Sequence, residues 1–413
     1  MTSVLRRLVI DTRPLRDYPQ YRRLWAGQTI SLLGTQITLV VVPVQVYALT
    51  GSSFAVGLLG LVALIPLVAS GLIGSTLVDA FDRRRLALGT SAGFTLASVV
   101  LLAQQQAHLR QVWLLYLVVA VQSGLAGIDS PARRAFIPRL LPADQVAPAN
   151  ALSQISYNVA LTGGPLLAGL VLATAGVGAA YLLDVVSFAG SAYALLRLHP
   201  MPPGPGGMRP GVAATLDGFR FLGTQPVLMM TFGADIIAMI FGMPRALFPA
   251  LAQQRFHAGP GAVGLLYAAV AAGALLGALG SGPLARIRRQ GRAVLLAIAG
   301  WGLAIIGFGL TASLGPALIF LALAGVADMI SAVFRSTILQ QATPDGLQGR
   351  MQGVFIVVVA GGPRLGDLEA GGVATLAGLE FSVVSGGLAA LAGIGLLAAL
   401  VPSFRRYEAR SPG

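Results

Sequence analysis

The feature that most constrains this chain is a series of long apolar runs, each separated from the next by arginine clusters or Gly/Pro turns. A transmembrane helix needs about 20 mostly apolar residues, because lipid cannot hydrogen-bond an open backbone. Twelve such runs occur, near 24–49, 54–78, 86–105, 112–132, 151–175, 178–198, 226–250, 261–284, 293–313, 315–334, 351–377 and 380–402. The sequence therefore predicts an all-α integral membrane protein with twelve transmembrane helices.

The composition of the 413 residues supports this class and excludes several others. Hydrophobic residues make up 55% and charged residues only 10%, which is unlike a soluble domain. All 28 basic residues are arginine, so there is no lysine for a P-loop or a Schiff base. The chain has no cysteine, and its three histidines lie far apart. We expect neither an enzyme, nor a cofactor, nor a metal site.

The arginines also predict the topology, because positively charged loops stay in the cytoplasm. With twelve spans, 24 arginines fall in the amino-terminal segment, the even-numbered connections and the carboxyl tail, and two, Arg110 and Arg255, fall on the other side. Both termini are therefore predicted to be cytoplasmic. Topology and attraction to anionic lipid account for the formal net charge of +13, so no nucleic acid partner is expected.

The spans divide into two halves. Residues 198–225 carry five prolines and six glycines and form the longest segment predicted to be non-helical, which indicates a linker. The pentapeptide AVGLL at 55–59 recurs at 262–266, half the chain later. The predicted parts are a cytoplasmic amino-terminal segment (1–23), a first six-helix bundle (24–198), a cytoplasmic linker (199–225), a second six-helix bundle (226–402) and a cytoplasmic tail (403–413). Two parallel six-helix repeats imply a central cavity between halves that rock.

Residues 75–85, STLVDAFDRRR, resemble the signature loop between helices two and three of the major facilitator superfamily, departing from it at Ser75, Ala80 and Asp82. Further segments resemble its enterobactin-export and macrolide-efflux branch: 42–46 (VPVQV), 216–221 (LDGFRF), 246–252 (ALFPALA) and 339–345 (LQQATPD) with Gly349 and Arg350. The resemblance implies a proton-coupled exporter of small molecules such as siderophores or drugs. Its setting would be the bacterial cytoplasmic membrane, and a monomer is expected because the fold encloses a path without a partner.

Ionisable residues inside the spans are the candidate functional groups, because each costs about 2.5–3.5 kcal/mol at bilayer depth. Asp235 and Arg245 lie in the seventh predicted span, where helical spacing would place them about 15 Å apart and toward one cavity. We expect Asp235 to couple to protons and Arg245 to contact substrate or a gate, although simple pairing within the bundle is open for both. Asp328 in the tenth span is a further candidate.

The eleventh span carries Arg364, Asp367 and Glu369 near its middle. Arg364 and Asp367 are three positions apart and so share a helix face, whereas Glu369 points elsewhere. Two interpretations are open: an internal ion pair that locks a glycine-rich helix, or protonation of one carboxylate that frees Arg364. Since no histidine lies inside a span, a proton relay would have to use carboxylates.

Two further groups complete the predicted site. A cytoplasmic gate is predicted from the signature loop and its counterpart in the second half: Asp79, Asp82, Arg83, Arg84 and Arg286. Simple anchoring by the arginines is the alternative. The resemblance places an antiporter-type hinge in helix five at Gly163, Gly164 and Pro165, for which ordinary close packing is the alternative.

The sequence thus predicts a proton antiporter that exports a small amphipathic molecule by alternating access. An uptake permease of the same fold is one alternative, because cavity charge does not fix the direction of transport. A membrane sensor that transports nothing is the other.

Overall fold

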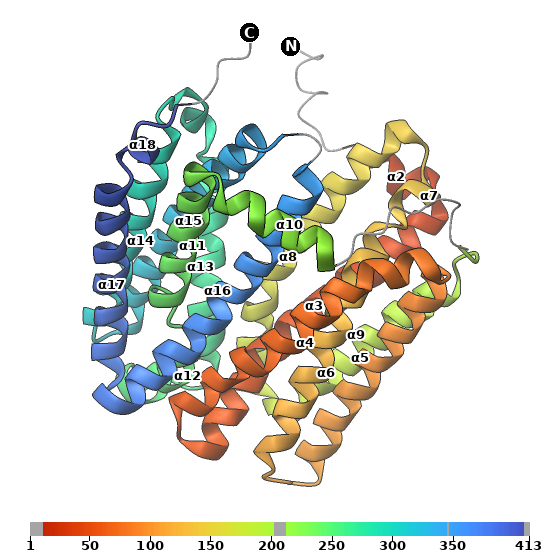
Figure 1. Cartoon of the computed structure of the whole chain (residues 1–413). Helices are drawn as coiled ribbons and strands as arrows, with labels where there is room; N and C mark the ends of the chain where they lie inside the picture. Colours follow the sequence, from red (N-terminus) through yellow and green to blue (C-terminus); the bar gives the residue numbers. More distant parts are fainter. Residues whose placement is uncertain (1–10, 202–211, 345–346, 409–413) are drawn as a thin grey trace, which may run out of the picture. The chain divides into compact units, whose positions relative to one another are not determined.

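The computed structural model describes residues 11–201, 212–344 and 347–408, and all side chains there except those at 72–80, 212–216, 285, 349–350, 352–353 and 356. All regular structure in this part of the chain is helical (Figure 1). The long helices are α3 (Pro19–Thr50), α4 (Ser53–Ala80), α5 (Arg83–Gln106), α6 (Val112–Arg134), α8 (Ala143–Thr174), α9 (Gly176–Leu196), α11 (Pro226–Phe241), α13 (Gly261–Leu279), α14 (Gln290–Leu310), α15 (Leu314–Ala342), α16 (Gln348–Ala377) and α17 (Leu379–Leu400). They take the positions of the predicted spans in order.

Short helical segments connect them. These are α2 (Arg13–Asp17), α7 (Ile137–Leu140), α10 (Val212–Gly223), η1 (Arg245–Leu247), α12 (Phe248–Ala250), the π-helical η2 (Leu251–Arg255), η3 (Gly282–Arg286) and α18 (Pro402–Arg405). Helix α10 corrects the prediction that 198–225 is non-helical, because the prolines of this stretch all precede it and leave VAATLDGFRFLG free to form helix.

Eleven helices of the described chain are long and apolar enough to cross a membrane. The exception among the long helices is α16, which carries Arg364, Asp367 and Glu369 within six positions. These side chains lower the mean hydropathy of the helix and must avoid lipid. Large apolar side chains elsewhere stay exposed, such as Leu276 at 62% and Leu279 at 77%, as a protein solvated by lipid requires.

The chain forms two compact units. Unit 1 comprises Met1–Val41 with Pro66–Arg209, and unit 2 comprises Val42–Ile65 with Pro210–Gly413. The chain passes from one unit to the other inside α3 and inside α4, and each passage lies beside a proline of the helix, Pro43 and Pro66. A proline inside a helix removes a backbone donor and permits a bend.

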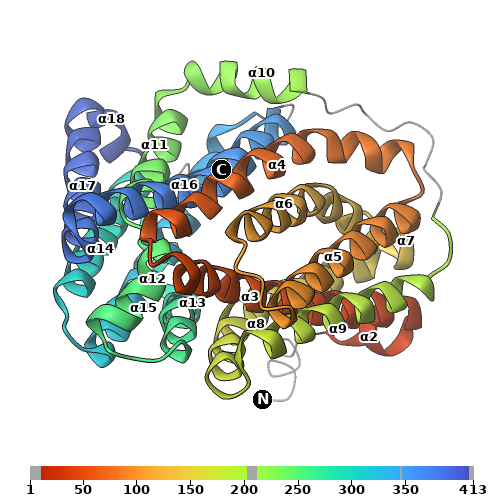
Figure 2. The same cartoon turned by 90° about the horizontal axis from the view of Figure 1, so that it is seen from below.

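In unit 1, α5 packs against α6 and α9 (Figure 2). The rings of Phe94 and Phe188 stack at 4.7 Å between α5 and α9. At the start of α5, Asp82 accepts from the backbone N–H of Arg85 and so caps the helix, because a carboxylate at this position satisfies a free N–H of the first turn.

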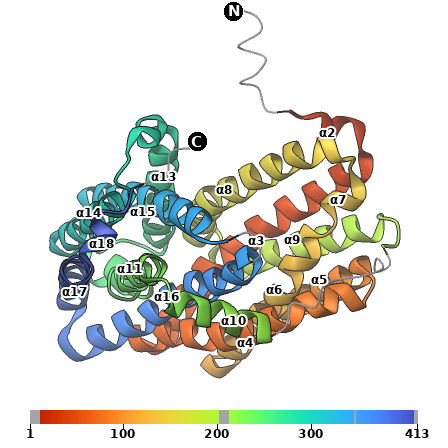
Figure 3. The same ribbon diagram turned by 45° about the horizontal axis from the view of Figure 1, so that its top comes forward.

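In unit 2, α14 lies between α15 and α17, and α13 packs on α15 (Figure 3). Glycines set the distance between α13 and α15. A Cβ atom at Gly273 would overlap the carbonyl oxygen of Ala322, and one at Gly325 would overlap that of Val270. The two backbones therefore approach as closely as small residues allow, which is the usual way for helices to associate in lipid.

Replacing Gly325 by Ala should push α15 away from α13. We expect a loss of about 1–3 kcal/mol in the free energy of unfolding in detergent, the usual range for overpacking. Gly315→Ala in the same helix is the matched control, because no atom lies within 4 Å of a Cβ built there. The control should leave stability unchanged or slightly higher, since Ala favours helix over Gly. Equal stability of the two variants would contradict the close approach.

Candidate functional site

Six charged side chains inside the spans of unit 2 lie in one group, which we call the ionic cluster. It is built from α11, η1, α15 and α16 and contains Asp235, Arg245, Asp328, Arg335, Arg364 and Asp367. Its three carboxylates balance its three guanidinium groups when all are ionised. Because each charge is costly in lipid, mutual neutralisation is the condition for keeping so many inside one bundle.

Arg335 and Asp235 form the most buried pair of the cluster. A guanidinium nitrogen of Arg335 contacts the Asp235 carboxylate, and the two side chains are 10% and 6% exposed. The other terminal nitrogen of Arg335 lies 3.4 Å from Asp328 Oδ1. One arginine on α15 is thus shared by an acid on α11 and an acid seven positions before it on its own helix.

The structure corrects the predicted location of Arg335, which was expected to be one of the cytoplasmic loop arginines. The tenth span was predicted to end at 334, but α15 continues to Ala342 and keeps Arg335 buried. The sequence does contain a signal for the longer helix, because residues 335–342 (RSTILQQA) can continue an amphipathic helix after the apolar run. Hydropathy alone stops at the first arginine and therefore missed the partner of Asp235.

Arg245 joins the second part of the cluster. Its Nη2 lies 3.6 Å from Asp367 Oδ2, and the side chains are 26% and 18% exposed. The charge of Arg245 also acts on Asp328 and on Arg364. Its Nε is buried and has no hydrogen-bond partner among the described residues. Arg245 therefore connects Asp328 of α15 electrostatically to α16.

A break in the seventh span brings Arg245 to this position. Helix α11 ends at Phe241, and Arg245 begins the short η1 after Gly242 and Pro244. The predicted axial spacing of about 15 Å between Asp235 and Arg245 requires one continuous helix and therefore does not apply. The proline, which has no backbone N–H, accounts for the interruption.

Trp301 of α14 stabilises the break. Its indole Nε1 donates to the Gly242 carbonyl oxygen at 2.9 Å, and the side chain is 1% exposed. The end of a helix leaves carbonyl groups without an intrahelical donor, and one that is buried needs another partner.

We expect Trp301→Phe to destabilise the protein by about 1–3 kcal/mol, because a buried carbonyl loses its donor while most of the aromatic packing stays. Thermal unfolding in detergent checks this. Trp113→Phe is the control, since Trp113 is 60% exposed on α6. A loss of stability as large in the control would show that the Gly242 hydrogen bond is not the cause.

Glycines hold α16 close to its neighbours within unit 2. A Cβ atom at Gly57 of α4 would overlap the Asp367 carbonyl oxygen, and one at Gly366 would overlap that of Met239 in α11. At Gly60, a Cβ would lie 2.5 Å from the Arg364 carbonyl oxygen. The helical turns that carry Arg364 and Asp367 are therefore clamped between α11 and the first half of α4. This backbone packing positions the two cluster residues that α16 contributes.

The predicted partnership of Arg364 with Asp367 is not an ion pair within 4 Å in the described structure. Arg364 Nη1 instead donates to the Ala360 carbonyl oxygen at 2.7 Å, and Asp367 faces Arg245. Glu369 is half-buried on the same helix and has no ion pair or hydrogen-bonded side chain among the described residues. It is the one candidate acid of α16 without a cation at ion-pair distance in the part of unit 2 that is described.

The predicted gate residues lie apart from this cluster. The Asp79 side chain is outside the described residues. Asp82 accepts from the Met201 N–H at 2.8 Å, and Arg84 donates to the Leu195 and Leu196 carbonyls at 3.1 and 2.7 Å. These contacts tie the start of α5 to the end of α9.

Arg83 adds to this tie, because its backbone N–H donates to the Met201 carbonyl oxygen at 3.2 Å. Arg83 is partly exposed on α5, with a buried Nε that has no partner in the described chain, and Arg286 is exposed in η3 of unit 2. Within each unit the contacts are those of anchoring residues, and a gating role stays a prediction.

The predicted hinge lies inside α8, which continues through Gly163, Gly164 and Pro165. A Cβ atom at Gly164 would overlap the Gln36 side chain of α3, whereas one at Gly163 would meet nothing within 4 Å. Gly164 thus permits close packing of α8 on α3 in unit 1. Bending at this point stays a prediction.

Unit 1 has an ionic network of its own, centred on Arg133 and Asp129 of α6. Arg133 Nε lies 2.6 Å from Asp129 Oδ2 on α6, and its side chain is 6% exposed. Arg133 also donates to Ser91 and Ser191 at 3.0 and 3.2 Å, and Asp129 accepts from Thr90 at 2.6 Å. The sequence signal for this network is the i,i+4 spacing of Asp129 and Arg133, together with serines and threonines on neighbouring spans.

Titratable carboxylates held beside arginines can exchange protons or bind a charged solute. The described residues include no group of three His, Cys, Asp or Glu side chains arranged to hold a metal ion.

Comparison with known proteins agrees with the fold and the spans. Residues 12–411 match the family described as transmembrane secretion effector. The enterobactin exporter EntS of Citrobacter koseri is 30% identical over 406 residues, which cover 96% of this chain and 95% of that protein.

Among solved structures, a POT family transporter in complex with a thioalcohol-conjugated peptide is similar with a TM-score of 0.74 at 12% identity, over 93% of this chain and 96% of that one. A bacterial homologue of the iron transporter ferroportin, in an inward-facing state, gives 0.70 at 15% identity, over 94% and 98%. These two likenesses concern the fold alone. The resemblance seen in the sequence is confirmed, and the family is one of transporters rather than enzymes. The chain belongs to the transmembrane secretion effector family of the major facilitator superfamily, as a multi-pass membrane transporter.

Proposed function

We propose that this transporter exports a small amphipathic molecule, of siderophore or drug-like chemistry, in exchange for protons. The membrane would be the bacterial cytoplasmic membrane, with both termini in the cytoplasm. The two six-helix halves would alternate access by rocking, as parallel repeats in this superfamily allow. Export as the direction is supported by the relative of 30% identity, which is an enterobactin exporter.

The observation that carries the proposal is the charge balance of the ionic cluster. Asp235 and Asp328 share Arg335, while Asp367 faces Arg245. Protonation of one carboxylate removes one negative charge and leaves a guanidinium group in excess. Such a group would either attract an acidic group of the substrate or exchange partners, and either event changes the energy difference between two conformations.

Glu369 supports proton exchange in a different way. It lies on the clamped helix α16 without a cation at ion-pair distance in the described structure. Taking up a proton would remove its charge without breaking an existing pair. We propose that Glu369 binds the transported proton and that the ionic cluster senses it through α16.

Everted membrane vesicles test direction and coupling together. With an acid interior, a proton-coupled exporter must accumulate its substrate inside the vesicle, and an uncoupler must release it. Fluorescent lipophilic drugs and a catecholate siderophore are suitable probes. An uptake permease would instead lose substrate from preloaded vesicles under the same gradient, so the sign of the flux separates the two functions.

The remaining alternative is a membrane sensor that transports nothing. Such a protein should show no gradient-driven flux across vesicles, whether or not its buried charges are present. The double variant Asp235→Asn with Asp367→Asn is expected to abolish gradient-driven accumulation. Wild-type accumulation in this variant would defeat the coupling proposal, and no flux in the wild type for any probe would favour the sensor.

A further inference from the structure

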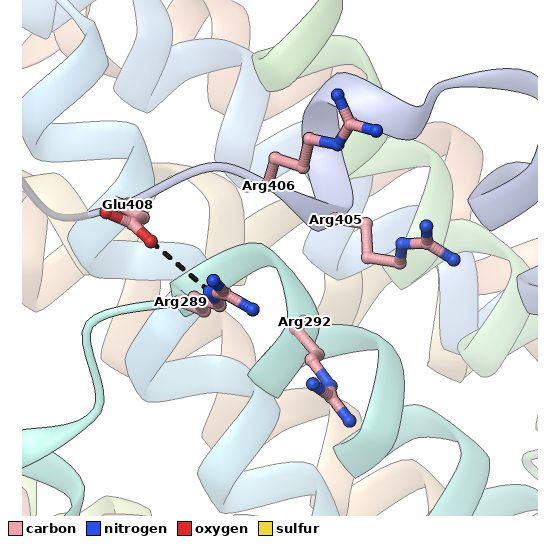
Figure 4. Close-up of a pocket in the computed structure, with 5 residues that line it drawn as sticks. All are labelled: Arg289, Arg292, Arg405, Arg406 and Glu408. Carbon is pink, nitrogen blue, oxygen red and sulfur yellow. Dashed lines mark hydrogen bonds and ion pairs between the residues drawn. The ribbon is translucent and has the colours of Figure 1, made fainter.

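Unit 2 has a second concentration of charge outside the ionic cluster. A cleft of about 590 Å³ lies where the first turn of α14 meets α18, and it is lined by Arg289, Arg292, Arg405, Arg406 and Glu408. Figure 4 shows that two of these arginines come from the beginning of α14 and two from the end of the chain. We call it the arginine cleft.

The arginine cleft carries an uncompensated positive charge. Its one acid, Glu408, pairs with Arg289 at 3.3 Å, and both side chains are more than half exposed. Four guanidinium groups against one carboxylate leave a formal charge of +3. Charges of one sign gathered in a hollow repel one another and favour a bound anion.

Packing fixes the two sides of the cleft relative to each other. A Cβ atom at Gly291 would overlap the Phe404 carbonyl oxygen, so the first turn of α14 touches the backbone of α18. Phe404 is 1% exposed beneath the arginines. The backbone segments that carry the four arginines are thus packed against each other.

The arginine cleft continues into an apolar surface. A neighbouring hollow of about 360 Å³ shares Arg289 and Arg292 with it, and its other lining residues are Arg286, Arg288, Ile287, Ala293 and Leu296. Leu296 is 61% exposed on α14, and Leu400 is 67% exposed at the end of α17, which packs beside α14. An anion bound here would therefore sit directly above side chains that face the acyl region of the membrane.

From this arrangement we propose that the arginine cleft binds the phosphate headgroup of an acidic phospholipid. Guanidinium groups bind phosphate oxygens through paired N–H donors, and basic pockets at helix ends are known sites for anionic headgroups. The exposed leucines would contact the acyl chains of the same lipid. A free phosphate ion would satisfy the arginines but would leave this apolar wall unused.

The test uses the full-length protein purified in detergent and titrated with phosphatidylglycerol or phosphatidylcholine, with bound lipid counted by native mass spectrometry. The cleft variant carries Arg292→Gln, Arg405→Gln and Arg406→Gln. The matched control carries Arg16→Gln, Arg134→Gln and Arg139→Gln, which removes the same charge from exposed positions of unit 1. A third variant, Glu408→Gln, removes the one acid of the cleft.

We expect the cleft variant to lose phosphatidylglycerol affinity by at least about tenfold, since each arginine near an anionic lipid contributes on the order of 1 kcal/mol. The control should change it by less than about twofold on the same reasoning. Glu408→Gln should bind phosphatidylglycerol more tightly, and phosphatidylcholine should bind weakly to every variant. Equal losses in the cleft and control variants would overturn the site, because diffuse charge would then explain binding.

Competition with inorganic phosphate distinguishes a lipid headgroup from a free phosphate ion, since both present phosphate oxygens to the arginines. Millimolar phosphate should displace little phosphatidylglycerol, because it lacks the acyl contacts. Complete displacement at that concentration would assign the cleft to a free anion and overturn the lipid. Correct folding of the cleft variant is checked by its thermal unfolding, and Arg→Lys at the same three positions should restore most of the binding if charge, rather than altered packing, is responsible.

Discussion

Asp235→Asn is expected to destabilise the protein by about 3–5 kcal/mol and to abolish transport, because it leaves the buried Arg335 with one acid at 3.4 Å. Asn keeps the shape of the side chain but not its charge. The free energy of unfolding in detergent and gradient-driven accumulation in everted vesicles measure the two effects.

A double-mutant cycle with Arg335→Gln separates the pair from its surroundings. Asp235→Asn with Arg335→Gln removes both charges and should recover a large part of the stability lost by either single variant. It should not recover transport. The exposed pair of Arg220 and Asp217, 3.5 Å apart on α10, is the matched control, and its coupling should stay below about 1 kcal/mol. Additive losses at Asp235 and Arg335 would contradict a buried ion pair.

Glu369→Gln is expected to reduce proton-driven transport by at least about tenfold, equivalent to about 1.4 kcal/mol, while substrate binding changes little. Gln has nearly the same shape but cannot exchange a proton. Since Glu369 has no ion pair in the described structure, the substitution should also leave stability nearly unchanged, unlike Asp235→Asn. Proton release on addition of substrate to the purified protein measures the coupling directly.

Glu380→Gln is the control for Glu369. Glu380 lies in the first turn of α17, is 57% exposed and pairs with Arg255 at 2.7 Å. Its neutralisation should affect neither proton release nor transport by more than about twofold, as is usual for an exposed pair. Wild-type proton release in Glu369→Gln would remove Glu369 from the mechanism. Asp328, which is 34% exposed, would then be the next acid to examine.

The positions of the spans could be predicted because hydropathy acts locally. Each helix in lipid satisfies its own backbone hydrogen bonds, so a run of apolar residues is enough to place it. The ends of the helices were harder to predict. Helix α15 continues eight residues beyond the predicted end at 334, because its last turns are amphipathic rather than apolar. Arg335 was assigned to a loop for this reason.

The residues of the candidate site could likewise be predicted from the sequence, but their partners could not. The cost of a charge in lipid singled out Asp235, Arg245 and the acids of α16 without any structure. Their partners did not follow from spacing. Arg364 and Asp367 are neighbours on one helix face, yet Asp367 faces Arg245 because η1 brings that arginine next to α16.

The sequence by itself determined that this chain is a helical membrane transporter and which few side chains bear charge inside it, since both depend on composition along the chain. Only the tertiary structure decided which charges meet, because that depends on which helix faces touch. The break after Phe241 and the glycines at 57, 60 and 366 set those faces, and they act through contacts between residues far apart in sequence.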